Sequence, residues 1–232
     1  MLSAERVVAG HRPGVPVLCG VDLTVTSGEV VGLAGPSGCG KSTLVRVLAL
    51  LLAPWSGDVR VDGKPVHRFG AHAPRELRTR VGVVFQSPRR SVNPRFSLRE
   101  VVAEPLRCTG VPAEPRADRV DTLADLVGLT PELLDRRPHQ VSDGQLQRAC
   151  LARALAARPR YLLCDEMTSM LDASTAAALV GVVRATVAAE GTAVLAVSHD
   201  DDLLAVWADR VHRLDLAGCG PGAGYPARDQ PG

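Results

Sequence analysis

Residues 29–43 read EVVGLAGPSGCGKST, an apolar run that leads into a glycine-rich loop and then into a helical pattern. The part from Gly35 to Thr43 matches G-x-x-x-x-G-K-[ST], a pattern that binds phosphate groups when a strand precedes it and a helix follows. Its glycines allow backbone amide hydrogens to point inward at phosphate oxygens, and the N-terminus of the following helix adds partial positive charge. The stretch therefore predicts a strand, a phosphate-binding loop and a helix in succession.

The side chains of this loop have separate expected roles. We expect Lys41 to reach the β- and γ-phosphates of a nucleoside triphosphate, and the Ser42 hydroxyl to ligate Mg²⁺. A glycine-rich turn that binds nothing is the alternative, and the strand-loop-helix setting argues against it. The predicted nucleotide-binding residues of the loop are Gly35, Pro36, Ser37, Gly38, Cys39, Gly40, Lys41, Ser42 and Thr43.

A second pattern, YLLCDE at residues 161–166, is an apolar run that ends in two adjacent acids. In a parallel sheet, the carboxyl end of such a strand lies beside the phosphate loop. We expect Asp165 to hold Mg²⁺ and Glu166 to orient or deprotonate the attacking water. Taken alone, the two acids could form a solvated turn, but the phosphate loop upstream favours the site.

Strand-like and helical segments alternate along the chain, which is typical of an α/β domain. Residues 86–159 are mainly helical in pattern, with a capping box at Ser97 and Glu100, so a helical insertion interrupts the α/β core. We expect strands at residues 21–25, 29–34, 57–63, 81–85, 161–164 and 192–197, and helices at 41–52, 115–129 and 173–189.

Composition limits the classes of protein that fit. The net charge is +2 with scattered arginines, which gives no nucleic-acid footprint. The longest purely apolar runs, such as residues 47–53, fall short of the roughly 18 residues of a spanning helix, and the N-terminus does not read as a secretory signal. We therefore expect a cytosolic chain whose membrane role, if any, comes through a partner.

Residues 141–148, VSDGQLQR, resemble the LSGGQ signature of ATP-binding-cassette (ABC) ATPases. Gln86 resembles the family's Q-loop glutamine, residues 169–172 its D-loop, and His199 its switch histidine. Singly, Gln86 could be a capping residue and His199 an ordinary loop histidine, but the order and spacing of the set match the family. The resemblance covers residues 2–216.

The resemblance implies a P-loop NTPase core with a mainly parallel sheet, an antiparallel β-subdomain and an inserted helical subdomain. A single ABC ATPase domain would span residues 1–232. Its core and β-subdomain would be residues 1–86 and 160–217, and its helical subdomain, with the signature, residues 87–159. Residues 218–232, rich in glycine and proline, would be a disordered tail.

The resemblance also implies a mechanism with ATP and Mg²⁺ as cofactors. Two ATPase subunits, identical or different, would associate head to tail, with ATP between one phosphate loop and the other subunit's signature. The catalytic residues would be Glu166, His199 and Gln86. The Mg²⁺ ligands would be Ser42, Gln86 and Asp165. The residues that act in trans would be Ser142, Gly144, Gln145 and Asp172. Transmembrane permease subunits and, indirectly, a substrate-binding protein would be the other partners, at the cytoplasmic face of the membrane.

Residues 86–95, 136–140 and 145–148 resemble peptide and nickel importers within the family. The chain ends without the cysteine-bearing extension of many peptide-importer ATPases, which favours the shorter, nickel-type members. An exporter-type ATPase and a weakened regulatory half-site are the alternatives.

Three positions depart from the family pattern. Asp143 replaces the first glycine of the signature pair, so either the half-site is weakened or the carboxylate turns outward and pairs with an arginine, which we favour. Met167 stands where the family usually has proline. His11 lies where the family stacks an aromatic ring on adenine, so it either stacks instead or is an exposed loop histidine.

Overall fold

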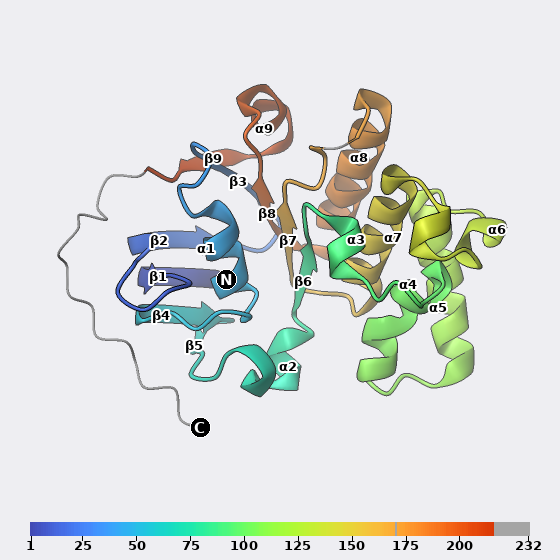
Figure 1. The fold of residues 1–232 in the computed structure, drawn as a ribbon, viewed down its shortest axis with the longest axis horizontal. Coiled ribbons are helices and arrows are strands. Elements are labelled where there is room, and N and C mark those ends of the chain that lie inside the picture. Colours follow the sequence, from blue (N-terminus) through green and yellow to red (C-terminus); the bar gives the residue numbers. More distant parts are fainter. Residues whose placement is uncertain (170, 216–232) are drawn as a thin grey trace.

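The computed structural model describes residues 1–169 and 171–215 (Figure 1). The expected tail, residues 218–232, and Met170 of the D-loop-like segment lie outside the described residues. The predicted boundaries of the domain and its subdomains remain a prediction.

The structure has two sheets of different character. The parallel sheet has the order β6-β7-β8-β3-β9, and the antiparallel sheet has the order β2-β1-β4-β5. The parallel strands are β3 (Val30–Ala34), β6 (Val81–Val84), β7 (Tyr161–Asp165), β8 (Ala193–Val197) and β9 (Arg210–Arg213). The antiparallel strands are β1 (Leu2–Ala9), β2 (Leu18–Val25), β4 (Ser56–Val61) and β5 (Lys64–Pro65).

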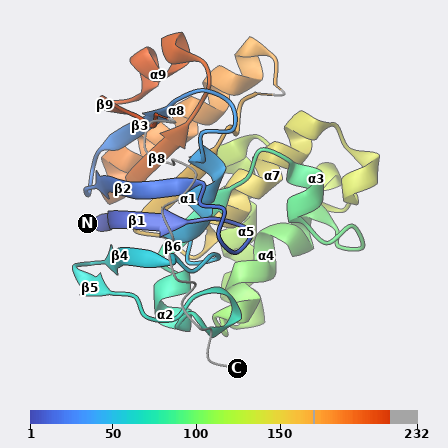
Figure 2. The ribbon, with the colours of Figure 1, turned by 60° about the vertical axis from the view of Figure 1, so that its left-hand side comes forward.

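Helices surround the sheets, and those between β6 and β7 gather on one side of the molecule, where α4, α5 and α7 pack together (Figures 1 and 2). The α-helices are α1 (Lys41–Leu48), α2 (Arg75–Arg78), α3 (Pro88–Ser91), α4 (Leu98–Cys108), α5 (Ala113–Val127), α6 (Pro131–Leu134), α7 (Asp143–Ala156), α8 (Ala173–Glu190) and α9 (Asp201–Trp207). Short 3₁₀ turns occupy Gly70–His72 and Pro138–Gln140.

The parallel sheet separates two hydrophobic cores, because successive side chains of a strand point to opposite faces. One face carries Val30 and Ala34 of β3 and packs with α7, α8 and the other helices. The opposite face carries Val31 and Leu33, and packs with α1 and the antiparallel sheet. Helices α1 and α7 therefore belong to different faces of the same sheet.

Local chemistry explains where several helices begin and end. Helix α1 ends at Leu48 rather than at the predicted residue 52, because Leu50 adopts a left-handed backbone with φ 61°. Gly128, with φ 70°, ends α5. The capping box predicted at the start of α4 is confirmed: the Ser97 hydroxyl accepts from the Glu100 amide at 3.2 Å, and the Glu100 carboxylate accepts from the Ser97 amide at 2.8 Å.

Helix α8 has the length and mean hydropathy, 1.3, of a membrane-spanning helix, although no purely apolar run in the sequence is that long. In the structure its Leu179, Val183 and Val187 are buried in the core against the sheet. Arg184 on its exposed side pairs with Asp209 at 2.9 Å. One side of α8 thus packs on the sheet, while most of the helix is not buried.

Candidate functional site

The predicted phosphate loop connects β3 to α1, as expected. Gly35, Gly38 and Gly40 all have positive φ, from 82° to 150°, which residues with a Cβ rarely adopt. The Lys41 side chain is buried, and its Nζ donates to the carbonyl oxygens of Gly35 at 2.6 Å and Pro36 at 3.0 Å. The Lys41 ammonium is therefore held by the carbonyl groups at the start of its own loop.

Ser42, in the first turn of α1, contacts Asp165, the last residue of β7, although β8 lies between β7 and the strand β3 that leads into α1. The Ser42 hydroxyl donates to Asp165 Oδ1 at 3.2 Å. Burial raises the pKa of the Asp165 carboxyl; the hydrogen bond from Ser42 opposes this shift, and the nearby Glu166 adds to it. A hydroxyl and a carboxylate in contact offer the oxygen ligands that Mg²⁺ takes alongside phosphate oxygens and water.

The Ser42 and Asp165 oxygens fit a Mg²⁺ ion that is held jointly with a phosphate group. Among residues 1–169 and 171–215, no group of three or more His, Cys, Asp or Glu side chains is arranged to hold a metal ion. Such all-protein clusters are not needed for Mg²⁺, which is usually bound through one or two carboxylates plus substrate phosphates.

The other two predicted catalytic residues, Gln86 and His199, both contact the Glu166 carboxylate. Gln86 Nε2 donates to Glu166 Oε2 at 2.7 Å, and His199 Nδ1 lies 3.6 Å from the same oxygen. The three residues follow the carboxyl ends of β6, β7 and β8, which are neighbours in the sheet. Glu166 itself has a left-handed backbone, φ 50°, and its amide donates to the Val197 carbonyl at 3.0 Å. The Glu166 carboxylate is thus fixed at the carboxyl ends of the parallel strands, and it is only partly exposed.

His11 lies close to the phosphate loop. Its Nε2 is 3.1 Å from the hydroxyl of Thr43, a buried residue of α1. This contact places the ring at the start of the helix that follows the loop; stacking on adenine remains a prediction.

The signature-like segment caps the N-terminus of α7. The Ser142 hydroxyl accepts from the Gln145 amide at 3.2 Å, and the Gln145 side chain accepts from the Ser142 amide at 3.0 Å. The helix begins at Asp143, directly after its N-cap Ser142. Gly144 lies in this first turn, next to Leu171 and Thr175.

Asp143 pairs with an arginine, as predicted, and the partner is Arg89 of α3, whose Nε lies 2.7 Å from Asp143 Oδ1. This oxygen is shielded from solvent and makes no well-aligned hydrogen bond with a described residue. The contact is therefore an ion pair and not a directed hydrogen bond.

Asp172, predicted to act in trans, caps α8. Its carboxylate accepts hydrogen bonds from the Ser174 hydroxyl at 2.6 Å and from the Thr175 amide at 2.9 Å. These bonds, that of Ser174 first, lower the pKa of Asp172. The adjoining loop contains Met167, which is buried where the family pattern has proline.

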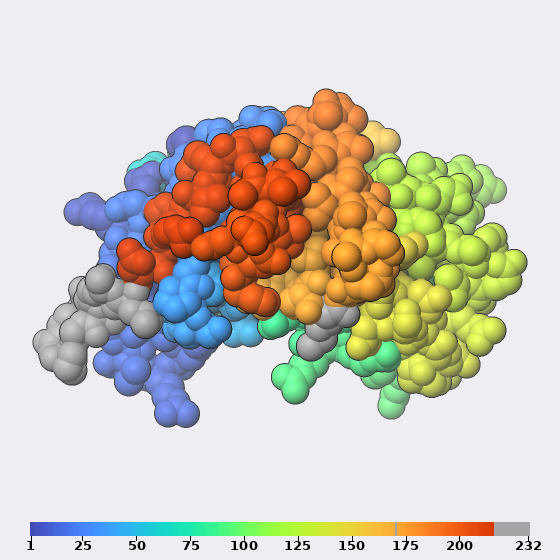
Figure 3. Space-filling model, turned by 90° about the horizontal axis from the view of Figure 1, so that it is seen from above, coloured from blue at the N-terminus to red at the C-terminus, as the bar shows by residue number. Residues whose placement is uncertain are grey.

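The phosphate loop and the signature-like segment of one chain lie apart. Helix α1 packs on one face of the parallel sheet and α7 on the other. In the space-filling view, the light blue of residues near 40 and the yellow of residues near 145 are separated by the orange and red C-terminal part (Figure 3). The two predicted halves of the ATP site therefore do not meet within the chain.

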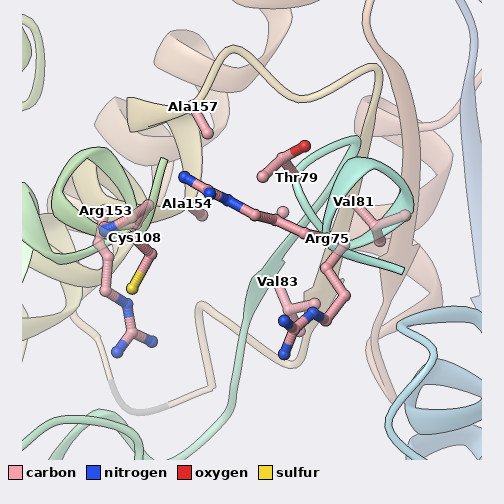
Figure 4. Close-up of a pocket in the computed structure, with 11 residues that line it drawn as sticks. Arg75, Thr79, Val81, Val83, Cys108, Arg153, Ala154 and Ala157 are labelled. Carbon is pink, nitrogen blue, oxygen red and sulfur yellow. The ribbon is translucent and has the colours of Figure 1, made fainter. Parts of the chain in front are cut away.

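A hollow of about 300 Å³ is lined by other residues (Figure 4). Val81 and Val83 of β6 and Ala154 of α7 contribute to its apolar lining, while Arg75 and Arg153 bring positive charge from α2 and α7. No predicted nucleotide-site residue lines this hollow. The chemistry of the side chains, and not this hollow, marks the candidate site.

Comparison with protein families decides the assignment. The model of the family described as "ABC transporter" matches residues 18–169. The chain belongs to the ABC transporter family. The family and the enzyme class predicted from the sequence, an ABC-type ATPase with a P-loop NTPase fold, are thus confirmed.

Relatives and solved structures of ABC proteins agree with this. The nickel import ATP-binding protein NikE of Brucella suis biovar 1 (strain 1330) is 40% identical over 224 residues, 93% of this chain and 84% of the relative. NikE of Escherichia coli (strain K12) is 39% identical over 207 residues, 89% and 77% of the two chains.

Two solved structures show the same fold. A dimeric ATP-binding cassette in a post-hydrolysis state, bound to ADP and Pi, has a TM-score of 0.83 and 29% identity over 93% of this chain and 95% of that one. The cbiO1 protein of Clostridium perfringens, part of the ABC transporter complex cbiONQ, has a TM-score of 0.79 and 27% identity over 93% and 84%.

Sequence reasoning missed Arg89, the residue that compensates Asp143. Arg89 lies shortly after Gln86, in a segment that the sequence already singles out. Because the chain has 27 lysines and arginines, this position alone does not identify the partner of Asp143. Only the folded chain identifies which of them reaches α7.

Proposed function

We propose that this chain binds and hydrolyses ATP on the cytoplasmic face of the membrane to power a nickel importer. The convergence of Gln86 and His199 on the Glu166 carboxylate, close to the Ser42–Asp165 pair, carries the proposal. These distances support a role of Glu166 as general base beside the proposed metal ligands, at the carboxyl ends of the parallel strands. Nickel as cargo is supported by the names of the relatives.

The residues of the phosphate loop would bind and orient the nucleotide. The loop amides and Lys41 would hold the β- and γ-phosphates. Ser42, Asp165 and Gln86 would hold Mg²⁺, which when bound neutralises the charge that develops on the transferring phosphoryl group. Thr43 and His11 lie at the start of α1, where His11 would stack on adenine.

Glu166 would accept the proton of the attacking water, or orient that water, as it approaches the γ-phosphorus. Gln86 donates to this carboxylate and so fixes its direction. His199 lies on the other side of Glu166, with a largely exposed ring that could donate to a γ-phosphate oxygen. Water, base and phosphate would thereby be held in one geometry, which accounts for much of the catalysis in phosphoryl transfer.

A second ATPase chain, identical or different, would complete the site. Ser142, Gly144 and Gln145 form the amide-rich start of α7, on the other sheet face from α1, and would meet the γ-phosphate held by the partner chain. Asp172, at the start of α8, would lie at the same junction. The dimeric cassette among the solved structures supports this arrangement. Permease subunits and a substrate-binding protein would complete the importer.

Uptake into vesicles tests the function. The chain, co-purified with its permease and ATPase partners, is reconstituted with the substrate-binding protein of the same complex. We expect uptake of radioactive nickel that requires ATP on the side of this chain and that Lys41→Ala abolishes. Uptake of dipeptides instead of nickel would overturn the cargo, and outward transport would favour the exporter alternative. ATP-independent uptake would overturn the function itself.

A further inference from the structure

One arginine of α3 contacts the start of the signature-like segment and the residues just before it. Arg89 Nη1 donates to the Pro138 carbonyl at 2.7 Å, and Nη2 donates to the Val141 carbonyl at 3.0 Å. The remaining nitrogen, Nε, lies 2.7 Å from Asp143 Oδ1. Nη1 and Nη2 thus donate as two arms of a rigid fork that a lysine could not reproduce, while Nε pairs with Asp143 by charge.

Asp143 is the member of this set whose charge matters for a phosphate site. It is the first residue of α7, between Ser142 and Gly144, which the proposed function places at a γ-phosphate. A carboxylate here favours the helix N-terminus but repels an anion bound at that same terminus. Both side chains of the ion pair are about half exposed, so Arg89 offsets the charge of Asp143 only in part, and it holds the solvent-shielded Oδ1 against its own Nε.

We propose that Arg89 is a positioning residue for ATP hydrolysis: by pairing with Asp143, it keeps this carboxylate off the γ-phosphate bound by the partner chain. The proposal rests on the proposed function, because it requires the start of α7 to face a nucleotide. With this pairing, a signature with an acid in place of glycine would remain competent.

The segment that carries Arg89, residues 85–91, is bound to α7 at two further points. Gln147 Nε2 donates to the Phe85 carbonyl at 3.2 Å, and Arg153 Nη1 donates to the Ser91 carbonyl at 2.5 Å. Gln86 lies within this segment and contacts Glu166. Loss of Arg89 would therefore leave the Asp143 carboxylate unpaired. It would also remove the hydrogen bonds that join residues 85–91 to Pro138 and Val141. An experiment must separate these two effects.

A double-mutant cycle separates them, since the charge effect needs Asp143 and the loop effect does not. The variants are Arg89→Met, Asp143→Gly and the double variant, with Arg90→Met of the same helix as the matched control. Each is measured as Mg²⁺-ATP turnover by the complete transporter complex. Far-UV circular dichroism and the unfolding midpoint of each chain report whether it folds.

We expect Arg89→Met to lower turnover about tenfold or more, and we expect the fall to be in kcat. The turnover of Asp143→Gly should stay within about twofold of wild type. The double variant, Arg89→Met with Asp143→Gly, should recover turnover to within about threefold of wild type. Arg89→Lys, which keeps the charge but not the fork, should be intermediate, and Arg90→Met should match wild type.

Three results would overturn the proposal while leaving the proposed function intact. One is a double variant as impaired as Arg89→Met, which would mean that Arg89 only supports the loop. Another is an Arg89→Met chain with wild-type turnover. The third is an Asp143→Gly chain that gains tenfold, because the carboxylate would then already impair the native site. A wild-type complex without Mg²⁺-ATP turnover would instead overturn the proposed function, and this inference with it.

Discussion

Glu166→Gln tests the assignment of the catalytic carboxylate. The side chains have the same shape, and an amide oxygen can still accept the 2.7 Å hydrogen bond from Gln86. The left-handed backbone at residue 166 is no more strained in glutamine than in glutamate. The substitution therefore removes basicity and charge with little change in structure, and we expect the free energy of unfolding to change by only about 0.5 kcal/mol.

The effect on catalysis should be large by comparison. Proton transfer by a positioned general base contributes about 10²- to 10⁴-fold, which corresponds to about 3–5 kcal/mol of barrier. We expect phosphate release at the half-site of this chain to fall by that factor, while ATP binding remains within about threefold of wild type. Nucleotide recovered from this chain after incubation should be ATP and not ADP.

The matched control is Glu114→Gln, which makes the same chemical change at an exposed position on α5. It should hydrolyse ATP as wild type does. If Glu166→Gln retained wild-type turnover, or if its bound nucleotide were ADP, the reasoning from the contacts of Gln86 and His199 to a catalytic role of Glu166 would be refuted.

Three further predictions concern stability and metal binding. Ser97→Ala should lower the free energy of unfolding by about 1 kcal/mol in urea, because α4 loses its N-cap, and Ser97→Asp should recover most of that loss. Asp62→Asn should cost about 1–2 kcal/mol at pH 7, since Asp62 accepts from Tyr161 at 2.5 Å and pairs with two arginines. Ser42→Ala should raise the Mg²⁺ concentration needed for half-maximal turnover at least about tenfold.

The pH dependence of the Asp62 effect has a definite sign. Burial of Asp62 opposes its ionisation, but the hydrogen bond from Tyr161 and the charges of Arg160 and Arg80 outweigh this, so its pKa lies below the ordinary 3.8. The stabilisation is therefore fully present above about pH 4 and is lost as the pH falls through the lowered value. The difference between wild type and Asp62→Asn should shrink below pH 4. A difference that stays constant down to pH 2, or that grows, would contradict this account.

The phosphate loop and the capping box of α4 could be predicted from sequence because their chemistry is local. Glycines with positive φ, a strand before them and a helix after them lie within residues 29–48, and Ser97 is three residues from Glu100. The buried strands β7 and β8 were predictable for a similar reason, since they are unbroken apolar runs.

Features that depend on distant contacts could not be predicted in the same way. Strand β9 reads RVHR, and it is a strand because it pairs with β3 at the edge of the sheet. Helix α1 was expected to continue through Leu50, whose apolar pattern is helical but whose backbone turns there. An arginine partner for Asp143 was expected from electrostatics alone, whereas its identity as Arg89, 54 positions before Asp143, required the fold.

The central claim, that this chain binds and hydrolyses ATP through its phosphate loop, has one direct measurement. It is phosphate release from ATP by the purified transporter complex, with Mg²⁺ and with excess chelator, for wild type, Lys41→Ala and the exposed control Lys64→Ala. We predict turnover that requires Mg²⁺, is lost in Lys41→Ala and is unchanged in Lys64→Ala. Turnover that survives in Lys41→Ala, or a wild-type complex that releases no phosphate, would contradict the claim.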